Sequence, residues 1–357
     1  MKEYKINEMK NIRLQGRNGR TAEGSVVLFW AAAAIEVNVK ATEVWAHISA
    51  DYENLEIWIS VEVNGAQIQR IMLPKEPAWI CLARNLNPQK ENLISIIKDT
   101  QPMPGDNKHI LKVDGFKIDD AGEFCGLKPR RQKIEFIGDS LTSGEGLSGR
   151  YDEMDWIPLW FCASRTYAVQ TAKRLDADWN CISQSGWGLC WSWDGNDKCR
   201  IPAYYSQVCG LLDGKEQKEA GSCLSFDFNG GSDLVILNLG TNDESGFPGF
   251  ENKGGEQRIV TEAKLFLSEI RRNNPHAKII WTWGMMPLRF VPDLIKKGID
   301  EYKKESGDNS VYTLELESMY SIEKCDADKG SRGHPGLLAH KKAAEKIAAF
   351  IESINNL

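Results

Sequence analysis

Ser140 is the residue of this sequence whose surroundings best suit a nucleophile. It follows the mostly apolar run 134–137, which predicts a short buried strand, and Gly138, where the backbone must turn sharply. In open α/β sheets, ligands bind at the carboxyl ends of the strands, which is where Ser140 is expected. A serine there is a candidate nucleophile, although a Gly-Asp-Ser turn by itself is more often ordinary turn chemistry.

A serine hydroxyl attacks an ester only when a neighbouring base removes its proton, and imidazole has an intrinsic pKa suited to that task. Of the five histidines, only His334 occupies a loop before a helix in the second part of the chain. We therefore expect His334 to be the base, and the alternative is a surface-loop histidine. The others lie in predicted β-structure, in a turn or inside the last helix: His47, His109, His276 and His340.

Further motifs follow Ser140 along the chain. Ser185-Gly186 comes after a predicted strand at 179–182, Asn242 comes after one at 234–239, and His334 precedes the last helical pattern. Ser, Gly, Asn and His thus occur in this order, each at a strand end or in a loop. The order resembles the SGNH hydrolases, also called the GDSL esterase/lipase family, over roughly residues 132–357.

This resemblance implies an oxyanion hole, the set of hydrogen-bond donors that stabilise the negative oxygen of an acyl-transfer intermediate. The implied donors are the backbone amides of Ser140 and Gly186 and the side-chain amide of Asn242. Each is chemically suitable, because glycine lets a backbone approach closely and Asn supplies a neutral N–H. Gly188 is an alternative to Gly186, and simple turn geometry is the competing explanation for all of these positions.

The third member of a catalytic triad is where the sequence departs from the family. Most relatives carry Asp three residues before the histidine, where this chain has Ser331, and Arg332 stands two residues before it. Asp326 or Asp328 could orient the imidazole from the loop, or a backbone carbonyl could do so and leave a Ser–His dyad, which we favour. The departure bears on the strength of the activity more than on its type.

Two neighbouring features limit the chemistry. The G-x-S-x-G elbow of α/β-hydrolases is absent around Ser140, since Thr142 holds the place of the second glycine, and this argues against an ordinary lipase. Asp139 and Asp243 adjoin key residues, but we expect them to be structural hydrogen-bonding groups rather than catalysts.

Trp187, Trp191 and Trp193 lie close together in the loop that holds Gly186. Indole faces pack on the apolar C–H faces of sugar rings, while the N–H stays available for a hydroxyl. These residues are therefore candidate substrate contacts, and the alternative is that they fill the core of the loop.

Before residue 128, the chain shows the pattern of an antiparallel β-sandwich. Asn64-Gly65 between two alternating runs is a strong hairpin signal, and no convincing helix interrupts the series. Residues about 10–120 are interpreted as a jelly-roll-like sandwich. The predicted strands are 26–30, 33–40, 43–49, 56–63, 67–73, 78–82, 93–98 and 109–118.

After the basic, proline-containing stretch 128–133, strands alternate with helices, which predicts a parallel sheet covered on both faces. We predict a β-sandwich domain at 1–127 and an α/β domain at 128–357, for which the SGNH resemblance implies a flavodoxin-like fold. Residues 186–228 fit the alternation poorly and are interpreted as a functional insertion. The predicted elements are helices at 163–175, 256–272, 293–304 and 336–354 and strands at 178–182, 234–239, 278–283 and 311–316.

A β-sandwich directly before an SGNH-type serine turn resembles carbohydrate esterase family two over nearly the whole chain. That resemblance implies removal of acetyl groups from sugar hydroxyls, as in acetylated xylan or mannan, without a metal or organic cofactor. An esterase acting on lipid or aryl esters, or a sugar-binding protein with a decayed hydrolase domain, are the alternatives. A strong preference for acetyl esters would argue against the first, and binding without turnover would indicate the second.

The amino-acid composition limits the classes of binding partner that we expect. A formal net charge of -6, from 50 acidic and 44 basic residues, gives no electrostatic footprint for nucleic acid or an anionic membrane. Nine cysteines without CxxC pairs indicate reduced thiols, and zinc is not expected. The start of the sequence has no apolar leader, so we expect a cytoplasmic protein, or a secreted one if a leader was removed. Self-association into a homo-oligomer through exposed strand edges is an open alternative.

Overall fold

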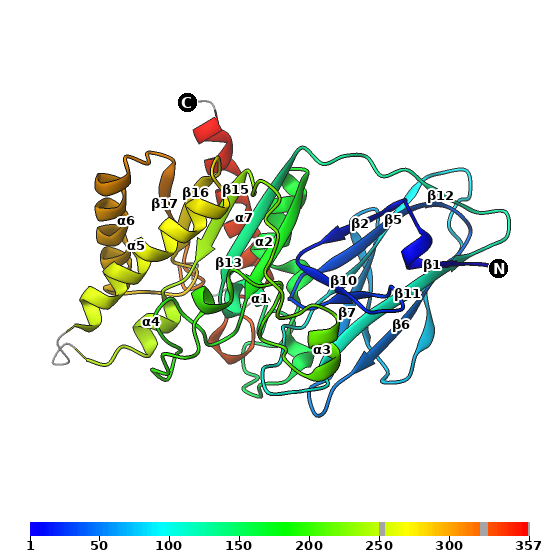
Figure 1. Cartoon of the computed structure of the whole chain (residues 1–357), viewed down its shortest axis with the longest axis horizontal. Coiled ribbons are helices and arrows are strands. Elements are labelled where there is room, and N and C mark those ends of the chain that lie inside the picture. The colour runs from blue at the N-terminus through cyan, green and yellow to red at the C-terminus, as the bar shows by residue number, and fades with distance from the viewer. Residues whose placement is uncertain (250–253, 322–327, 356–357) are drawn as a thin grey trace. The chain divides into compact units, whose positions relative to one another are not determined.

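The computed structural model describes residues 1–249, 254–321 and 328–355. The chain divides into two compact units (Figure 1). The first consists of Met1–Pro129, Ile157–Leu159 and Ser206–Phe226, and the second of Arg130–Trp156, Trp160–Tyr205 and Asp227–Leu357.

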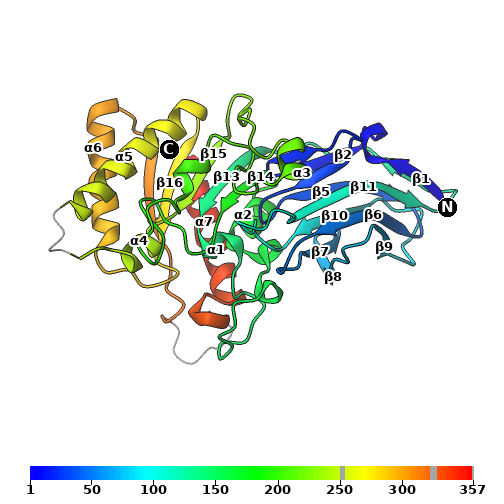
Figure 2. The same cartoon turned by 60° about the horizontal axis from the view of Figure 1, so that its bottom comes forward.

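The first unit contains two antiparallel sheets (Figure 2). One has the order β3-β4-β11-β6-β9, with β1 also paired to β11: β1 (Lys2–Lys5), β3 (Asn18–Arg20), β4 (Val26–Leu28), β6 (Val44–Asp51), β9 (Ala78–Ala83) and β11 (Ile110–Ile118). The other has the order β12-β5-β10-β7-β8, with β2 also paired to β5: β2 (Ile12–Gln15), β5 (Ala34–Lys40), β7 (Trp58–Val63), β8 (Ala66–Met72), β10 (Asn92–Lys98) and β12 (Glu123–Cys125). Two short helices complete the unit: η1 (Ile6–Glu8) and α3 (Lys215–Glu219).

Alternation of apolar and polar side chains explains this sandwich. Val37 of β5, Ile48 of β6 and Ile94 of β10 belong to one hydrophobic core, while every second residue points to the opposite face. The predicted hairpin forms at Asn64 and Gly65, whose φ angles of +53° and +83° are those of a type I′ turn. The predicted sandwich is confirmed, and the sequence interpretation missed only short strands, namely β1, β2, β3 and β12.

The first unit also takes in residues 206–226, which the sequence interpretation assigned to the domain at 128–357. The fully buried indole of Trp30 donates a hydrogen bond to the Val208 carbonyl at 2.7 Å. The Arg20 amide donates to the Ala220 carbonyl at 3.1 Å, where Gly19 leaves no room for a side chain. A buried indole N–H needs an acceptor, and this later segment supplies it.

The second unit is built on a parallel sheet with the order β14-β13-β15-β16-β17. In chain order this is second, first, third, fourth and fifth, the flavodoxin-like arrangement in which ligands bind where the order reverses. The reversal lies between β13 and β15, the strands that precede Ser140 and Asn242. The strands are β13 (Gln132–Gly138), β14 (Ala177–Ser183), β15 (Leu234–Asn238), β16 (Lys278–Trp283) and β17 (Val311–Glu315).

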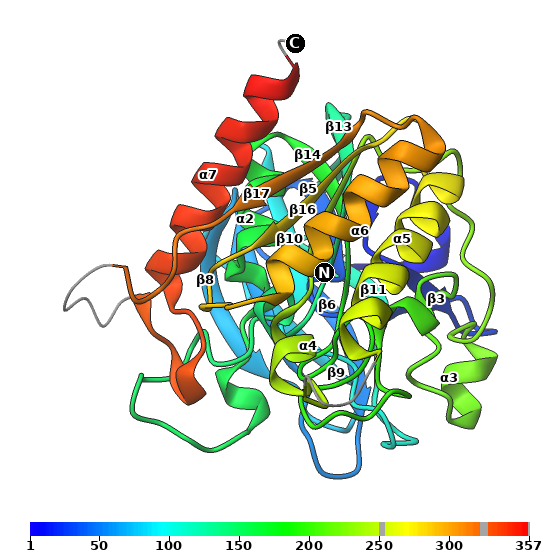
Figure 3. The same ribbon diagram turned by 90° about the vertical axis from the view of Figure 1, so that its left-hand side faces the viewer.

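Helices cover both faces of this sheet. Figure 3 shows α5 and α6 on one side of the strands and α2 and α7 on the other. Each buries an apolar stripe at helical spacing, as in α5 at Ile259, Ala263, Phe266 and Ile270. The helices are α1 (Ser140–Ser143), α2 (Tyr167–Arg174), α4 (Thr241–Ser245), α5 (Gly255–Asn273), α6 (Val291–Ser306) and α7 (Leu337–Asn355), with 3-10 turns η3 (Ala163–Arg165), η4 (Ile201–Tyr204) and η6 (Ser331–Gly333). A further 3-10 turn, η2 (Pro158–Trp160), begins in the first unit and ends at the first residue of the next segment of the second.

Two findings concern the described part of the chain as a whole. None of its helices combines the length and the apolar character that a bilayer span requires. Its cysteines are all free thiols.

Candidate active site

The nucleophile candidate lies at the first residue of α1. Gly138 ends β13, and a Cβ there would lie 2.0 Å from Thr142 Oγ1, so the turn requires glycine. Asp139 then caps the helix, because its carboxylate accepts a hydrogen bond from the Leu141 amide at 3.0 Å. Strand end, glycine turn and cap together fix the backbone of Ser140, whose residue surface is only 5% exposed.

His334 follows η6 and reaches this serine. Its Nε2 lies 2.9 Å from Ser140 Oγ, and its Nδ1 lies 3.2 Å from the backbone carbonyl oxygen of Arg332. A carbonyl oxygen can only accept, so Nδ1 carries the hydrogen in this pair. Nε2 therefore presents its lone pair to the serine hydroxyl, which is the tautomer that a general base requires.

Arg332 is held at several points. Its φ of +57° and ψ of 29° place it in the left-handed region, where a non-glycine residue is uncommon. Its amide donates to the Glu153 carbonyl at 2.8 Å, and its guanidinium donates to the Met154 carbonyl at 2.8 Å and to Glu145 Oε1 at 3.2 Å. These contacts fix the carbonyl that orients His334.

Glu145 is a member of this site that the sequence interpretation did not assign. Its side chain is 6% exposed, and Oε2 lies 3.7 Å from Nε2 of His334. A carboxylate at that distance is close enough to interact with a charge on the imidazole during proton transfer. The available signal was an acidic residue between two glycines, Gly144 and Gly146, directly after the nucleophile turn.

The two aspartates suggested as the third triad member are Asp326 and Asp328. Asp328 is 1% exposed and pairs with Lys342 Nζ at 3.1 Å. Asp326 lies outside the described residues. Ser331, at the usual aspartate position, places its hydroxyl 3.5 Å from the Gly146 carbonyl oxygen. In the part of the chain that the structure describes, the partner of the His334 Nδ1 is the Arg332 carbonyl, which is the geometry of a Ser–His dyad.

The suggested oxyanion donors come from three different segments. No acceptor within residues 1–249, 254–321 and 328–355 pairs with the backbone amides of Ser140 and Gly186. The Asn242 side-chain nitrogen donates to the Trp187 carbonyl at 2.9 Å and makes a longer contact of 3.4 Å with Asp139. One of its two N–H bonds is thus firmly committed, and the weakly bonded one is available for an oxyanion.

Asp243 has the structural role that its position suggested. Its carboxylate accepts hydrogen bonds from the amides of Leu189 at 2.8 Å and Cys190 at 2.7 Å, and its carbonyl accepts one from the Trp191 indole at 2.9 Å. A Cβ on Gly188 would lie 2.5 Å from this carboxylate, so Gly188 is used for close packing. Burial raises the pKa of Asp243 to about 6 and, likewise, that of Asp139 to about 7.

The three tryptophans of the loop differ in exposure. Trp191 is 3% exposed and its indole N–H is used within the loop, so it fits the loop-core alternative. Trp187 is half-buried beside Tyr204, with ring centroids 5.4 Å apart. Trp193 is 63% exposed and lies against Gly186, where a Cβ would come within 2.8 Å of the indole.

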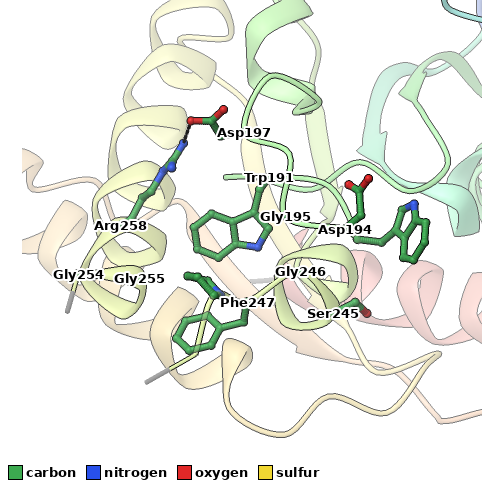
Figure 4. A pocket seen from close by; sticks show the side chains of 12 residues that line it. Trp191, Asp194, Gly195, Asp197, Ser245, Gly246, Phe247, Gly254, Gly255 and Arg258 are labelled. Carbon is green, nitrogen blue, oxygen red and sulfur yellow. Dashed lines mark ion pairs between the residues drawn. The ribbon is translucent and has the colours of Figure 1, made fainter. Parts of the chain in front are cut away.

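A cavity of about 790 Å³ adjoins Trp193. Figure 4 shows the Trp191 indole between the side chains of Arg258 and Phe247, with Asp197 paired to Arg258 at 3.7 Å. Aromatic and charged side chains therefore line the same space, whereas Ser140, Gly186, Asn242 and His334 do not line it.

Known proteins share this architecture. A family two carbohydrate esterase from Clostridium thermocellum, solved with cellohexaose, is 26% identical, with 97% of this chain and 99% of that chain covered and a TM-score of 0.80. An acetyl xylan esterase from the rumen bacterium Butyrivibrio proteoclasticus is 33% identical over 100% of both chains, with a TM-score of 0.93. The chain belongs to carbohydrate esterase family two.

The family resemblance and the combination of jelly roll and SGNH domain, both inferred from the sequence, are thereby confirmed. A curated relative of this family two chain is the cellulase/esterase CelE of Acetivibrio thermocellus, which is 28% identical over 328 residues. That match covers 91% of this chain but 37% of the relative, so the chain spans little more than a third of its length. No family model matches the chain.

Proposed function

We propose that this family two esterase removes acetyl groups from the hydroxyls of hemicellulose-type sugars through a serine acyl-enzyme. The observation that carries the proposal is the 2.9 Å contact between Ser140 Oγ and His334 Nε2, on an imidazole whose other nitrogen is held by a backbone carbonyl. Nucleophile, base and orienting group are then in place before the substrate arrives.

In the first half-reaction, Ser140 Oγ attacks the acetyl carbonyl carbon while His334 Nε2 takes the hydroxyl proton. The C–O bond to the sugar then breaks, and the same proton passes from Nε2 to the departing sugar oxygen. In the second half-reaction, water attacks the acetyl-serine, His334 again transfers the proton, and acetate leaves.

The negative charge of each tetrahedral intermediate falls on the former carbonyl oxygen. The amides of Ser140 and Gly186 and the weakly bonded N–H of Asn242 are the donors assigned to it. Losing one such donor typically costs about 10²–10³ in rate. Glu145 adds a negative charge beside the imidazolium and so takes over part of the role of the missing aspartate.

The sugar assignment draws on the loop after β14. Trp193 offers an exposed indole, and Asp194, Asp197 and Arg258 line the cavity beside it. Such walls suit sugar hydroxyls better than a long acyl chain, which would require an apolar channel. An acetylated oligosaccharide or polysaccharide is therefore the proposed substrate, in line with the names of the acetyl xylan esterase and the cellulase/esterase among the relatives.

The test is acetate release from 4-nitrophenyl acetate and from acetylated xylo-oligosaccharides, with wild type, Ser140→Ala and His334→Ala. Ser148→Ala is the matched control, because Ser148 is an exposed serine a short distance along the same segment. We expect kcat/KM to fall at least about 10³-fold in both site variants and to stay unchanged in the control. Wild type that binds the sugar without releasing acetate would contradict the proposal.

A further inference from the structure

A second cavity, of about 600 Å³, lies in the first unit. This volume is within the range of roughly 300–1,000 Å³ that small-molecule sites occupy. His47 of β6 and Trp79 of β9 stand opposite each other on adjacent strands at its floor. The neighbours of His47 on β6, Ala46 and Ile48, are buried in the sandwich core, so His47 points away from the core to the outer face of the sheet.

A β-bulge in β11 supplies the polar centre of this cavity. The register against β6 shifts between Val113 and Gly115, which leaves Asp114 without a partner on that strand. The Asp114 carboxylate contacts His47 Nδ1 at 2.8 Å and accepts a hydrogen bond from Ser25 Oγ at 2.6 Å. Bulges re-aim side chains and are frequent next to functional sites, and this one connects three strands or loops through a single carboxylate.

The network leaves one ring nitrogen of His47 for a ligand. Because a carboxylate accepts, Nδ1 donates to Asp114, and Nε2 is the remaining nitrogen. The described part of the chain supplies no hydrogen-bond partner to Nε2, and the side chain is 31% exposed. Trp79 stands beside it with ring centroids 5.0 Å apart. An aromatic wall and a pre-oriented polar group thus face the same space.

The charges around the cavity restrict the ligand class. Four carboxylates line it, Glu3, Glu8, Glu23 and Asp114, against one cation, Lys5, and this excess of negative charge disfavours an anion. Lys117 Nζ lies 4.4 Å from the Trp79 ring centroid, so one side of this indole already has a cation over it. No group of three or more His, Cys, Asp or Glu side chains within the described residues could hold a metal ion. An uncharged molecule rich in hydroxyl groups fits this lining, since hydroxyls donate to carboxylates and accept from or donate to an imidazole.

We propose that this cavity is a saccharide-binding site separate from the catalytic residues. Trp79 packs against the C–H face of a sugar ring on the side of the indole that Lys117 does not cover, while His47 Nε2 and Asp114 hydrogen-bond the sugar hydroxyls. We expect the sugar to belong to the same class of polysaccharide that carries the acetyl esters, and this expectation rests on the proposed function. Such a site keeps the enzyme attached to a polysaccharide while acetyl groups are removed elsewhere along it.

The test is native affinity electrophoresis of the full chain in gels that contain soluble xylan, glucomannan or mixed-linkage β-glucan. The variants are Trp79→Ala and His47→Ala. Trp45→Ala is the matched control, because Trp45 lies on the same strand as His47 and also contacts Lys117, at 5.0 Å, but does not line the cavity. Hydrolysis of 4-nitrophenyl acetate by the same proteins, with Ser140→Ala added, tests the proposed function separately.

At least one polysaccharide is expected to retard the wild type, with binding about tenfold or more weaker in Trp79→Ala and His47→Ala and unchanged in Trp45→Ala. Hydrolysis of 4-nitrophenyl acetate should be the same in these three variants and lost only in Ser140→Ala. The saccharide site is refuted if no polysaccharide retards the wild type, if both cavity variants bind as the wild type does, or if Trp45→Ala loses as much. Loss of hydrolysis in Ser140→Ala with unchanged retardation in Trp79→Ala would refute this site and leave the proposed function standing.

Discussion

Replacing Glu145 by Gln tests whether a charge beside the imidazole compensates for the missing triad aspartate. Gln keeps the size of the side chain and an oxygen that can accept from Arg332 Nε, now 3.2 Å from Glu145 Oε1. It removes the negative charge 3.7 Å from Nε2 of His334. The change therefore separates the electrostatic contribution of Glu145 from its packing.

The size of the effect follows from Coulomb's law. Two unit charges at 3.7 Å attract by about 4 kcal/mol at an effective dielectric constant of about 20. The Arg332 guanidinium contacts the same carboxylate and offsets part of this, so a net loss of about 1–3 kcal/mol is expected. Because the imidazole is charged only as the reaction proceeds, kcat and kcat/KM should both fall about 10–100-fold while KM stays constant.

The assay is steady-state acetate release from an acetylated xylo-oligosaccharide, with burst kinetics on 4-nitrophenyl acetate to follow acylation alone. Glu153→Gln is the matched control, since Glu153 contacts Arg332 only through its backbone carbonyl. The control should retain wild-type rates. The reasoning is refuted if Glu145→Gln keeps its kcat within twofold, or if its KM rises while kcat is unchanged.

Three further changes test other parts of the site. Burial raises the pKa of Asp139 from 3.8 to about 7, so the stability that its proton contributes is complete below pH 4 and is lost as the pH rises towards 7. The variant Asp139→Asn still caps α1 but does not titrate, so the unfolding free energy should fall by about 2 kcal/mol less between pH 5 and pH 7 than in the wild type. An unaltered pH dependence in urea titrations would contradict this. Gly188→Ala places a Cβ 2.5 Å from the Asp243 carboxylate and should destabilise the protein by about 1–3 kcal/mol, seen as a lower Tm, whereas an unchanged Tm would show that the loop gives way freely. Trp193→Ala should raise KM for acetylated oligosaccharides about tenfold and leave 4-nitrophenyl acetate within twofold, and equal effects on both substrates would argue against a sugar contact.

Local pattern was sufficient to predict most elements of the fold. The strands of the sandwich core alternate or run apolar, and Asn64-Gly65 fixes a hairpin through two positive φ angles. The strands missed were short or at the sheet edges. The three-residue β3 pairs with the neighbouring β4, and β1 pairs with β11, far along the chain. The assignment of residues 206–226 failed for the same reason, because the acceptor that the Trp30 indole needs lies 178 residues away.

The residues of the site likewise fall into those that local sequence signals predict and those that only the structure identifies. Ser140, Gly186 and Asn242 could be proposed because each follows a local strand-and-turn signal, and His334 because it lies in a loop before the last helix. Glu145 could not be assigned, since its meaning depends on a contact with His334 that no local pattern encodes. The substrate role of the loop tryptophans stays a prediction, and the sequence could not separate the buried Trp191 from the exposed Trp193.

The sequence by itself determined the order of strands, turns and helices and the residue types that a serine esterase needs, because propensity and apolar periodicity act over a few residues. Only the tertiary structure decided what orients the imidazole. Arg332 adopts a left-handed backbone conformation and presents its carbonyl to His334 because Glu145, Glu153 and Met154 hold it there. Those partners lie between 178 and 187 positions away in the chain, and folding alone brings them within hydrogen-bonding distance.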